Sequence, residues 1–214
     1  MKWIITINVL ITVHVTVNAQ SYNYFPVKLN TVTYDSLSKL QFGLSLNNYG
    51  VNPHLGINIG PSNFLIFSAQ VNNGNNSFDP LNIQNIIFNE LSQEFISAVP
   101  GDISYFEVMW GGVSLSKKQK LEISGGFNSE FNEEYFGMFI QGEWAASNHI
   151  IEASYLERIS LLLKDGDSKL VAQQAVQFKL NFDRFRFVNQ FGFASEVEFE
   201  YVRPIFNLGL EIVL

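Results

Sequence analysis

Hydrophobic and polar residues alternate along most of the chain, and the alternation is clearest over residues 185–201. Phenylalanines dominate one set of alternate positions, whereas Arg186, Gln190 and three glutamates occupy the other set. Successive side chains of a strand point to opposite faces, so this pattern predicts a strand with one apolar and one polar face. The stretch also exceeds the roughly 9–11 residues with which a tilted strand crosses a bilayer. It therefore predicts a strand long enough to extend beyond a membrane.

The same period predicts ten strands in all, joined by turns rich in Gly, Asn, Asp, Ser and Pro. Short connections alternate with mostly longer ones, as in bacterial membrane barrels, which have short periplasmic turns and longer outer loops. The expected fold class is an all-β, antiparallel up-and-down transmembrane barrel of about 10 strands, in a range of roughly 8 to 12. The predicted strands cover residues 40–46, 55–59, 64–71, 104–111, 121–127, 135–144, 151–158, 171–182, 185–201 and 206–214. The short connections are 60–63, 116–119, 145–148 and 183–184, and the others include 47–53 and 164–167.

Residues 72–103 form the longest connection and carry a different period. Asp79 and Pro80 are typical of a helix start, with a capping side chain followed by proline at the first helical position. Apolar residues then follow at helical spacing as far as Ala98, before Pro100 and Gly101 end the run. The pattern predicts one short amphipathic helix in a long outer loop. Its apolar face would be covered by the barrel rim, by lipid headgroups or by an unknown protein partner.

The N-terminus has the features of an export signal. Lys2 precedes an apolar stretch over residues 4–17, and small side chains lead to Ala19. We expect cleavage after Ala19; the alternative is a retained N-terminal membrane anchor. Residues 20–38 are polar and aromatic without a sustained period. The expected organisation is a signal peptide (1–19), a periplasmic lead-in (20–38) and a barrel domain (39–214).

Composition limits the classes of protein that fit. Only 15% of residues are charged, 47% are hydrophobic and 20 are phenylalanine, whereas an average soluble domain has about 25% charged residues. After residue 20 no apolar run approaches the roughly 20 residues of a membrane-spanning helix, so a spanning chain would cross with strands. The net charge of -7 argues against nucleic-acid binding. The absence of cysteine excludes disulfides, thiolate metal sites, thiol catalysis and a lipid-anchoring cysteine.

Alternation alone does not tell a membrane barrel from a soluble one, because a lipocalin-like barrel points its apolar face inward. The polar positions here are rich in Gly, Gln, Asn and Ser, whereas a water-exposed face is rich in Lys, Arg, Asp and Glu. Small and amide side chains suit a crowded lumen. Charges inside it would need partners, because unpaired buried charges are costly. The candidate lumen charge network consists of Glu107, Glu122, Glu143, Glu152, Arg158, Lys179, Arg186 and Glu211.

Candidate catalytic and metal-binding residues are few. Beyond the signal, the histidines are His54, placed at a turn, and His149. His149 has the opposite strand parity to Glu152 and Ser154, so these three do not converge into a catalytic triad. We therefore predict no enzymatic activity and no cofactor.

Two acidic groups are candidate ion sites. Residues 165–167, with the sequence Asp-Gly-Asp, lack the further carboxylates of a calcium loop and read as a solvated turn. Glu196, Glu198 and Glu200 lie on one strand face as a candidate acidic mouth, the alternative being a solvated extension of the strand. No metal site is expected.

The export signal, the period-two strands and the apolar last strand, with Phe206, Leu208, Leu210 and Ile212 at alternate positions, resemble those of small porin-like outer-membrane β-barrel proteins of Gram-negative bacteria. The resemblance spans about residues 40–214. It implies residence in the outer membrane, contact with its lipid, and recognition of the C-terminal strand by the barrel assembly machinery. That family's last strand commonly ends in an aromatic residue, whereas this chain ends in Leu214.

Three functions fit these expectations. The first is a structural or interaction barrel with a side-chain-filled lumen, because about eight strands leave room only for side chains and porin channels use about 16. The second is a narrow pore for ions or small solutes, in which Lys179, Arg186 and the lumen glutamates set selectivity. The third is a soluble secreted, lipocalin-like ligand-binding barrel.

Overall fold

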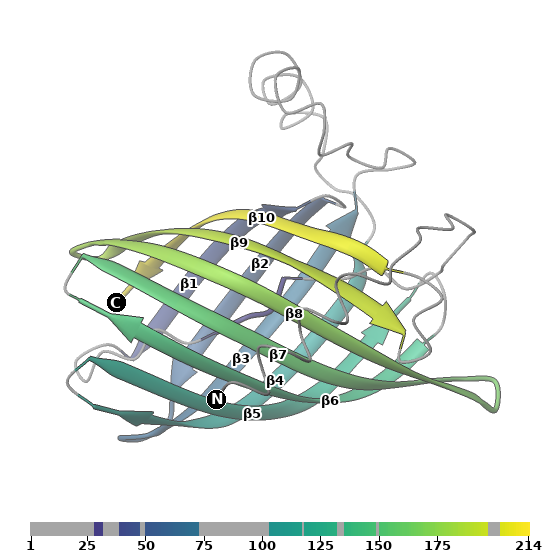
Figure 1. Ribbon diagram of the computed structural model, residues 1–214. Helices are drawn as coiled ribbons and strands as arrows, with labels where there is room; N and C mark the ends of the chain where they lie inside the picture. The colour runs from purple at the N-terminus through teal and green to yellow at the C-terminus, as the bar shows by residue number, and fades with distance from the viewer. Residues whose placement is uncertain are drawn as a thin grey trace, which may run out of the picture.

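The computed structural model describes residues 28–31, 39–47, 50–72, 103–116, 118–131, 135–148, 150–196 and 202–214. Ten antiparallel strands pair in sequence order, and the first also pairs with the last, which closes an up-and-down barrel (Figure 1). The predicted all-β class, strand count and topology are thus confirmed. The strands are β1 (Leu40–Asn47), β2 (Gly50–Asn58), β3 (Asn63–Asn72), β4 (Ile103–Leu115), β5 (Gln119–Glu130), β6 (Tyr135–Ser147), β7 (Ile151–Lys164), β8 (Asp167–Phe182), β9 (Phe185–Glu196) and β10 (Val202–Val213).

Several predictions fall outside the described residues. They are the export signal at 1–19, the loop helix within 72–103, and the part of the long strand at 197–201. Among the described residues, no helix is long and apolar enough to cross a membrane.

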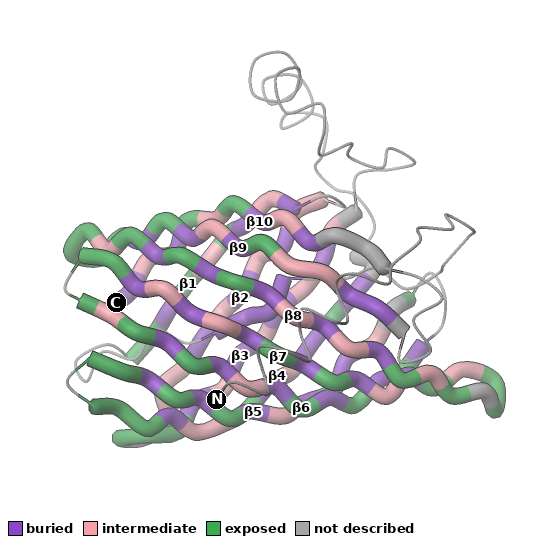
Figure 2. Tube along the Cα trace, in the orientation of Figure 1, coloured by how far each residue is buried: buried purple, intermediate pink, exposed green. Residues whose placement is uncertain are grey.

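The faces of the strands follow the predicted parity. Buried and exposed positions alternate along β6 and β7 (Figure 2). Large apolar side chains point outward, among them Ile140, which is 70% exposed, whereas Gln, Ser, Lys and Glu side chains are buried inside. The predicted orientation, apolar outside and polar inside, is therefore confirmed for the described strands.

Some apolar side chains also fill the lumen. Phe64, Ile66, Met109, Val113 and Phe139 form one buried cluster, and Tyr135, Leu162, Val171, Ala194 and Ile205 form a second. Glycine makes room for one of these rings, because a Cβ on Gly126 would overlap Phe139 and the backbone of Val108. The interior thus combines apolar packing with a polar network.

Three connections differ from the sequence prediction. The predicted loop 164–167 is a tight turn at Asp165 and Gly166, whose positive φ values of 49° and 91° let β7 and β8 continue almost to its tip. The resulting hairpin projects beyond the neighbouring strands (Figure 1). The predicted turn 47–53 is shorter, since β2 begins at Gly50, and Pro204 lies within β10 rather than ahead of it.

Pro53 shows how a proline is accommodated within β2. The pairing of β2 with β3 passes from Val51↔Val71 to His54↔Ser68, so Ala69 lies opposite Pro53. Proline has no N–H to donate to the backbone carbonyl of Ala69. The buried Asn52 side chain supplies the missing donor, with Nδ2 2.7 Å from the Ala69 carbonyl oxygen.

Asn52→Ala is therefore expected to lower the free energy of unfolding by about 1–3 kcal/mol, because it leaves the part-buried Ala69 carbonyl without a donor. Equilibrium denaturation of the folded barrel would measure the loss. Ser45→Ala is the matched control, since its buried hydroxyl makes only a 3.4 Å contact with the Asn52 carbonyl. Equal losses in the two variants would contradict the role given to Asn52.

Candidate functional site in the barrel lumen

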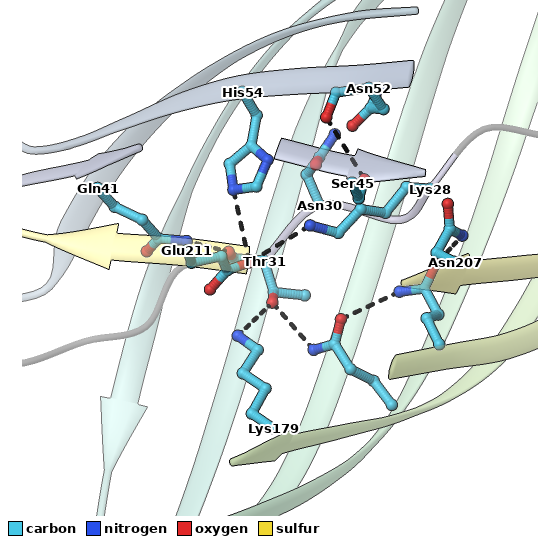
Figure 3. A network of polar contacts seen from close by, with 12 residues as sticks. Lys28, Asn30, Thr31, Gln41, Ser45, Asn52, His54, Lys179, Asn207 and Glu211 are labelled. Atoms are coloured by element: carbon cyan, nitrogen blue, oxygen red, sulfur yellow. Dashed lines mark hydrogen bonds and ion pairs between the residues drawn. The ribbon is translucent and has the colours of Figure 1, made fainter. Parts of the chain in front are cut away.

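Residues 28–31 lie inside the barrel, and Figure 3 shows Lys28, Asn30 and Thr31 among side chains of the wall. Lys28, Leu29, Asn30 and Thr31 are each at most 1% exposed. The sequence pattern predicts that these residues belong to a periplasmic lead-in, whereas the structure places them in the barrel lumen. They lack strand periodicity because they contact side chains on several strands rather than pairing with one strand. We call residues 28–31 the lumen segment.

Glutamines from the wall bind the backbone of the lumen segment. Gln190 on β9 uses both ends of its amide: Oε1 accepts from the Leu29 N–H at 3.0 Å, and Nε2 donates to the Leu29 carbonyl at 3.0 Å. Two further amides donate to the next carbonyls, Gln141 to Asn30 at 2.7 Å and Gln41 to Thr31 at 3.3 Å. Amide side chains thus replace the ladder that a neighbouring strand would provide.

The side chains of the lumen segment have separate partners. Lys28 Nζ lies 3.3 Å from Glu211 Oε1, and the Thr31 hydroxyl accepts from Lys179 Nζ at 2.8 Å. Leu29 belongs to a buried apolar cluster with Leu156 and Ala175.

Asn30 and Thr31 make the remaining polar contacts of the segment. Asn30 Nδ2 donates to the Ser68 hydroxyl at 2.9 Å and lies 3.5 Å from Glu107 Oε1. Gln177 Nε2 donates to the Thr31 hydroxyl at 3.2 Å. Each side chain of the segment therefore contacts at least one group on the wall.

Arg158 on β7 is the centre of the first charge cluster. Its guanidinium donates to both oxygens of Glu107, at 2.6 and 3.0 Å, and to Gln141 Oε1 at 3.0 and 2.7 Å. The guanidinium also lies over the Phe139 ring, 3.9 Å from its centroid. Tyr105 donates its hydroxyl proton to Glu107 at 2.5 Å. A buried bidentate pair of this kind is stable because each charge has several hydrogen bonds.

Lys120 on β5 is the centre of the second cluster. Its Nζ lies 2.5 Å from Glu143, 3.7 Å from Glu152 and 3.8 Å from Glu122. Glu122 and Glu143 are direct cross-strand neighbours, and the contact of Lys120 with both carboxyl groups reduces any repulsion between them. Lys179 reaches Glu152 at 3.7 Å and links this cluster to the lumen segment.

All eight predicted network residues are buried in the lumen. Glu107 and Arg158 lie in the first cluster, and Glu122, Glu143, Glu152 and Lys179 lie in or beside the second. Glu211 contacts Lys28, and Arg186 lies opposite Glu211 in the pairing of β9 with β10. Together with Lys28 and Lys120, the described buried ions comprise five cations and five carboxylates.

Sequence reasoning missed Lys28, Lys120 and the glutamines that bind the lumen segment. Lys120 has the same strand parity as Glu122, so period two could have placed it inside. Lys28 gives no such signal, because polar and apolar residues do not alternate in the sequence around it.

The other candidate residues lie partly within and partly outside the described structure. His54 differs from its expected turn position: it lies in β2, is 5% exposed, and has Nε2 3.5 Å from Glu211. A Cβ on Gly43 would overlap the His54 ring, so that glycine makes room for it. His149, Glu198 and Glu200 lie outside the described residues, as does the Glu196 side chain. Within the described ranges, no group of three or more His, Asp or Glu side chains is arranged to hold a metal ion.

The fold and the site define a closed ten-strand antiparallel barrel with an apolar outer surface and a packed, charge-balanced lumen. No protein-family model matches the chain, and a search of curated proteins gives no match.

Proposed function

We propose that the protein is an outer-membrane barrel of Gram-negative bacteria with a structural or interaction role, a filled lumen and no enzymatic activity. The observation that carries the proposal is the outward apolar face, which includes Trp110, Ile140 and Phe187 at 47%, 70% and 49% exposure. Soluble monomers seldom expose contiguous apolar patches above a few hundred Å². A closed barrel also pairs its backbone groups between strands, as a bilayer requires.

The inward polar face supports this proposal over a lipocalin-like carrier. Such a soluble barrel encloses an apolar cavity and exposes its polar face, which is the reverse of the arrangement here. The lumen segment and the two charge clusters occupy the interior, which favours a filled barrel over an open pore. In this proposal the partners are outer-membrane lipid, the barrel assembly machinery acting through β10, and a protein partner at the loop 72–103.

A labelling experiment on intact cells tests the location. Asp165 is exposed at the tip of the β7–β8 hairpin, and Asp183 is exposed in the β8–β9 turn at the opposite end of these strands. Both have a positive φ, 49° and 53°, so the two cysteine substitutions are matched in backbone strain. The natural chain has no cysteine and gives no background.

A membrane-impermeant maleimide is expected to label Asp165→Cys on intact cells. Asp183→Cys is expected to react only after the outer membrane is permeabilised, and both variants should fractionate with that membrane. Recovery of the protein in the soluble fraction, or equal labelling of both variants on intact cells, would contradict the proposal.

A further inference from the structure

The barrel wall is complete without the lumen segment. β1 pairs with β10 from Gln41↔Val213 to Asn47↔Asn207, and this pairing closes the sheet. Among the described residues, the segment joins the wall through side-chain contacts rather than as a strand of the sheet. Withdrawing it would break those contacts and leave the backbone ladder of the wall intact.

The wall binds the lumen segment as a protein binds an extended peptide. The paired contacts of Gln190 with the Leu29 N–H and carbonyl depend on the backbone and not on the side chain. Selectivity for the side chains of the peptide comes from other residues of the wall. Glu211 selects a cation, and the apolar surface of Leu156 and Ala175 selects an aliphatic side chain. Main-chain bonds for affinity and side-chain pockets for selectivity are the pattern of strand-recognising proteins.

The charges set Lys28 apart from the other buried ions. Lys120, Arg158, Lys179 and Arg186 belong to the strands, whereas Lys28 lies on the lumen segment. Without Lys28, the described wall keeps four buried cations against five carboxylates. The wall therefore favours a basic residue beside Glu211, because a buried carboxylate that loses its lysine contact is costly.

We propose that the lumen is a binding site for an extended peptide strand and that residues 28–31 are its exchangeable resident ligand. The site takes a basic residue, an aliphatic residue and then two small polar residues. This inference goes beyond the proposed function, because binding depends on the lumen and not on where the barrel resides.

The first experiment measures exchange on the full-length protein in detergent. The probe is a fluorescent synthetic peptide with the sequence of residues 24–35, followed by anisotropy. The wild-type segment competes at an effective concentration of about millimolar, because it is tethered to the barrel. A full-length variant with Leu29→Ala, Asn30→Ala and Thr31→Ala weakens the tethered ligand and leaves the wall unchanged.

The weakened variant is expected to bind the peptide at least about tenfold more tightly than the wild type does. A control peptide carrying Lys28→Glu should lose this binding, because it places a carboxylate beside Glu211. A folded weakened variant that does not bind the peptide, or that binds both peptides equally, would overturn the proposal.

A disulfide provides the reversible control. Leu29 and Ala175 belong to one contact cluster, and the chain has no other cysteine to interfere with a Leu29→Cys, Ala175→Cys pair. This pair is introduced into the weakened variant in place of its Leu29→Ala change. Oxidation should abolish peptide binding and reduction should restore it. Peptide binding that is unaffected by oxidation of the pair would place the peptide outside the lumen and refute the site.

A second measurement applies if the weakened variant does not fold. Leu29→Cys alone is compared with Ala194→Cys, a lumen-facing wall residue that is 4% exposed and lies in another cluster. Local opening of an exchangeable segment should make maleimide labelling of Leu29→Cys at least about tenfold faster than that of Ala194→Cys. Equal rates would show that the segment leaves only when the barrel unfolds, which refutes exchange. If exchange fails but the protein still fractionates with the outer membrane, only this inference is refuted and the proposed function is not contradicted.

Discussion

Arg158→Met is expected to lower the free energy of unfolding by about 3–5 kcal/mol, because it leaves a buried carboxylate without its cation. Glu107 is fully buried, and it would retain only the Tyr105 hydroxyl and the distant Asn30 amide as polar contacts among those described above. The guanidinium bonds to Gln141 would be lost in the same step. Denaturant unfolding of the barrel in lipid vesicles would measure the change.

Two further variants serve as controls for Arg158→Met. Glu107→Gln combined with Arg158→Met removes both charges, so it should cost less than Arg158→Met alone. Lys118→Met removes an exposed cation and should change stability by less than about 0.5 kcal/mol. A loss for Arg158→Met as small as that for Lys118→Met would show that the buried pair contributes little.

Ile140→Arg is expected to reduce the stability of the barrel in a bilayer by about 2–4 kcal/mol, because arginine would face acyl chains near the midplane. Ile140 lies near the middle of β6 and is 70% exposed on the outer face. Equilibrium unfolding from lipid vesicles would provide the measurement. The prediction depends on the proposed membrane location.

Ile59→Arg is the matched control, because Ile59 is 66% exposed but lies beyond the end of β2. Arginine there should cost no more than about 1 kcal/mol, as expected near an interface. A barrel surrounded by water would tolerate both substitutions alike. Equal effects would therefore contradict the membrane location, whatever their size.

Period two in the sequence was sufficient to predict the strands, their count and their faces. Each of these follows from the local geometry of a strand, in which alternate side chains point to opposite faces. The strand boundaries predicted at Pro53 and Pro204 were wrong because they relied on a local rule. Proline commonly marks a strand end, but at Pro53 the Asn52 side chain replaces the missing donor, a contact across strands that the sequence pattern does not show.

The candidate site was predicted only where it follows strand parity. All eight predicted network residues lie on strands, and their inward direction could be read from alternation. The lumen segment could not be predicted in this way. Its polar partners come from seven strands, among them Gln41 on β1, Gln141 on β6 and Gln190 on β9, and no local pattern encodes contacts of that range.

The place of the lumen segment has a consequence for the order of folding. Lys28 is made early, but its partner Glu211 lies 183 residues later in the chain. Contacts of such long sequence separation form late, because the intervening chain must first be ordered. The earliest of the described residues to leave the ribosome are thus among the last to reach their final position, and they are seated only when the final hairpin is in place.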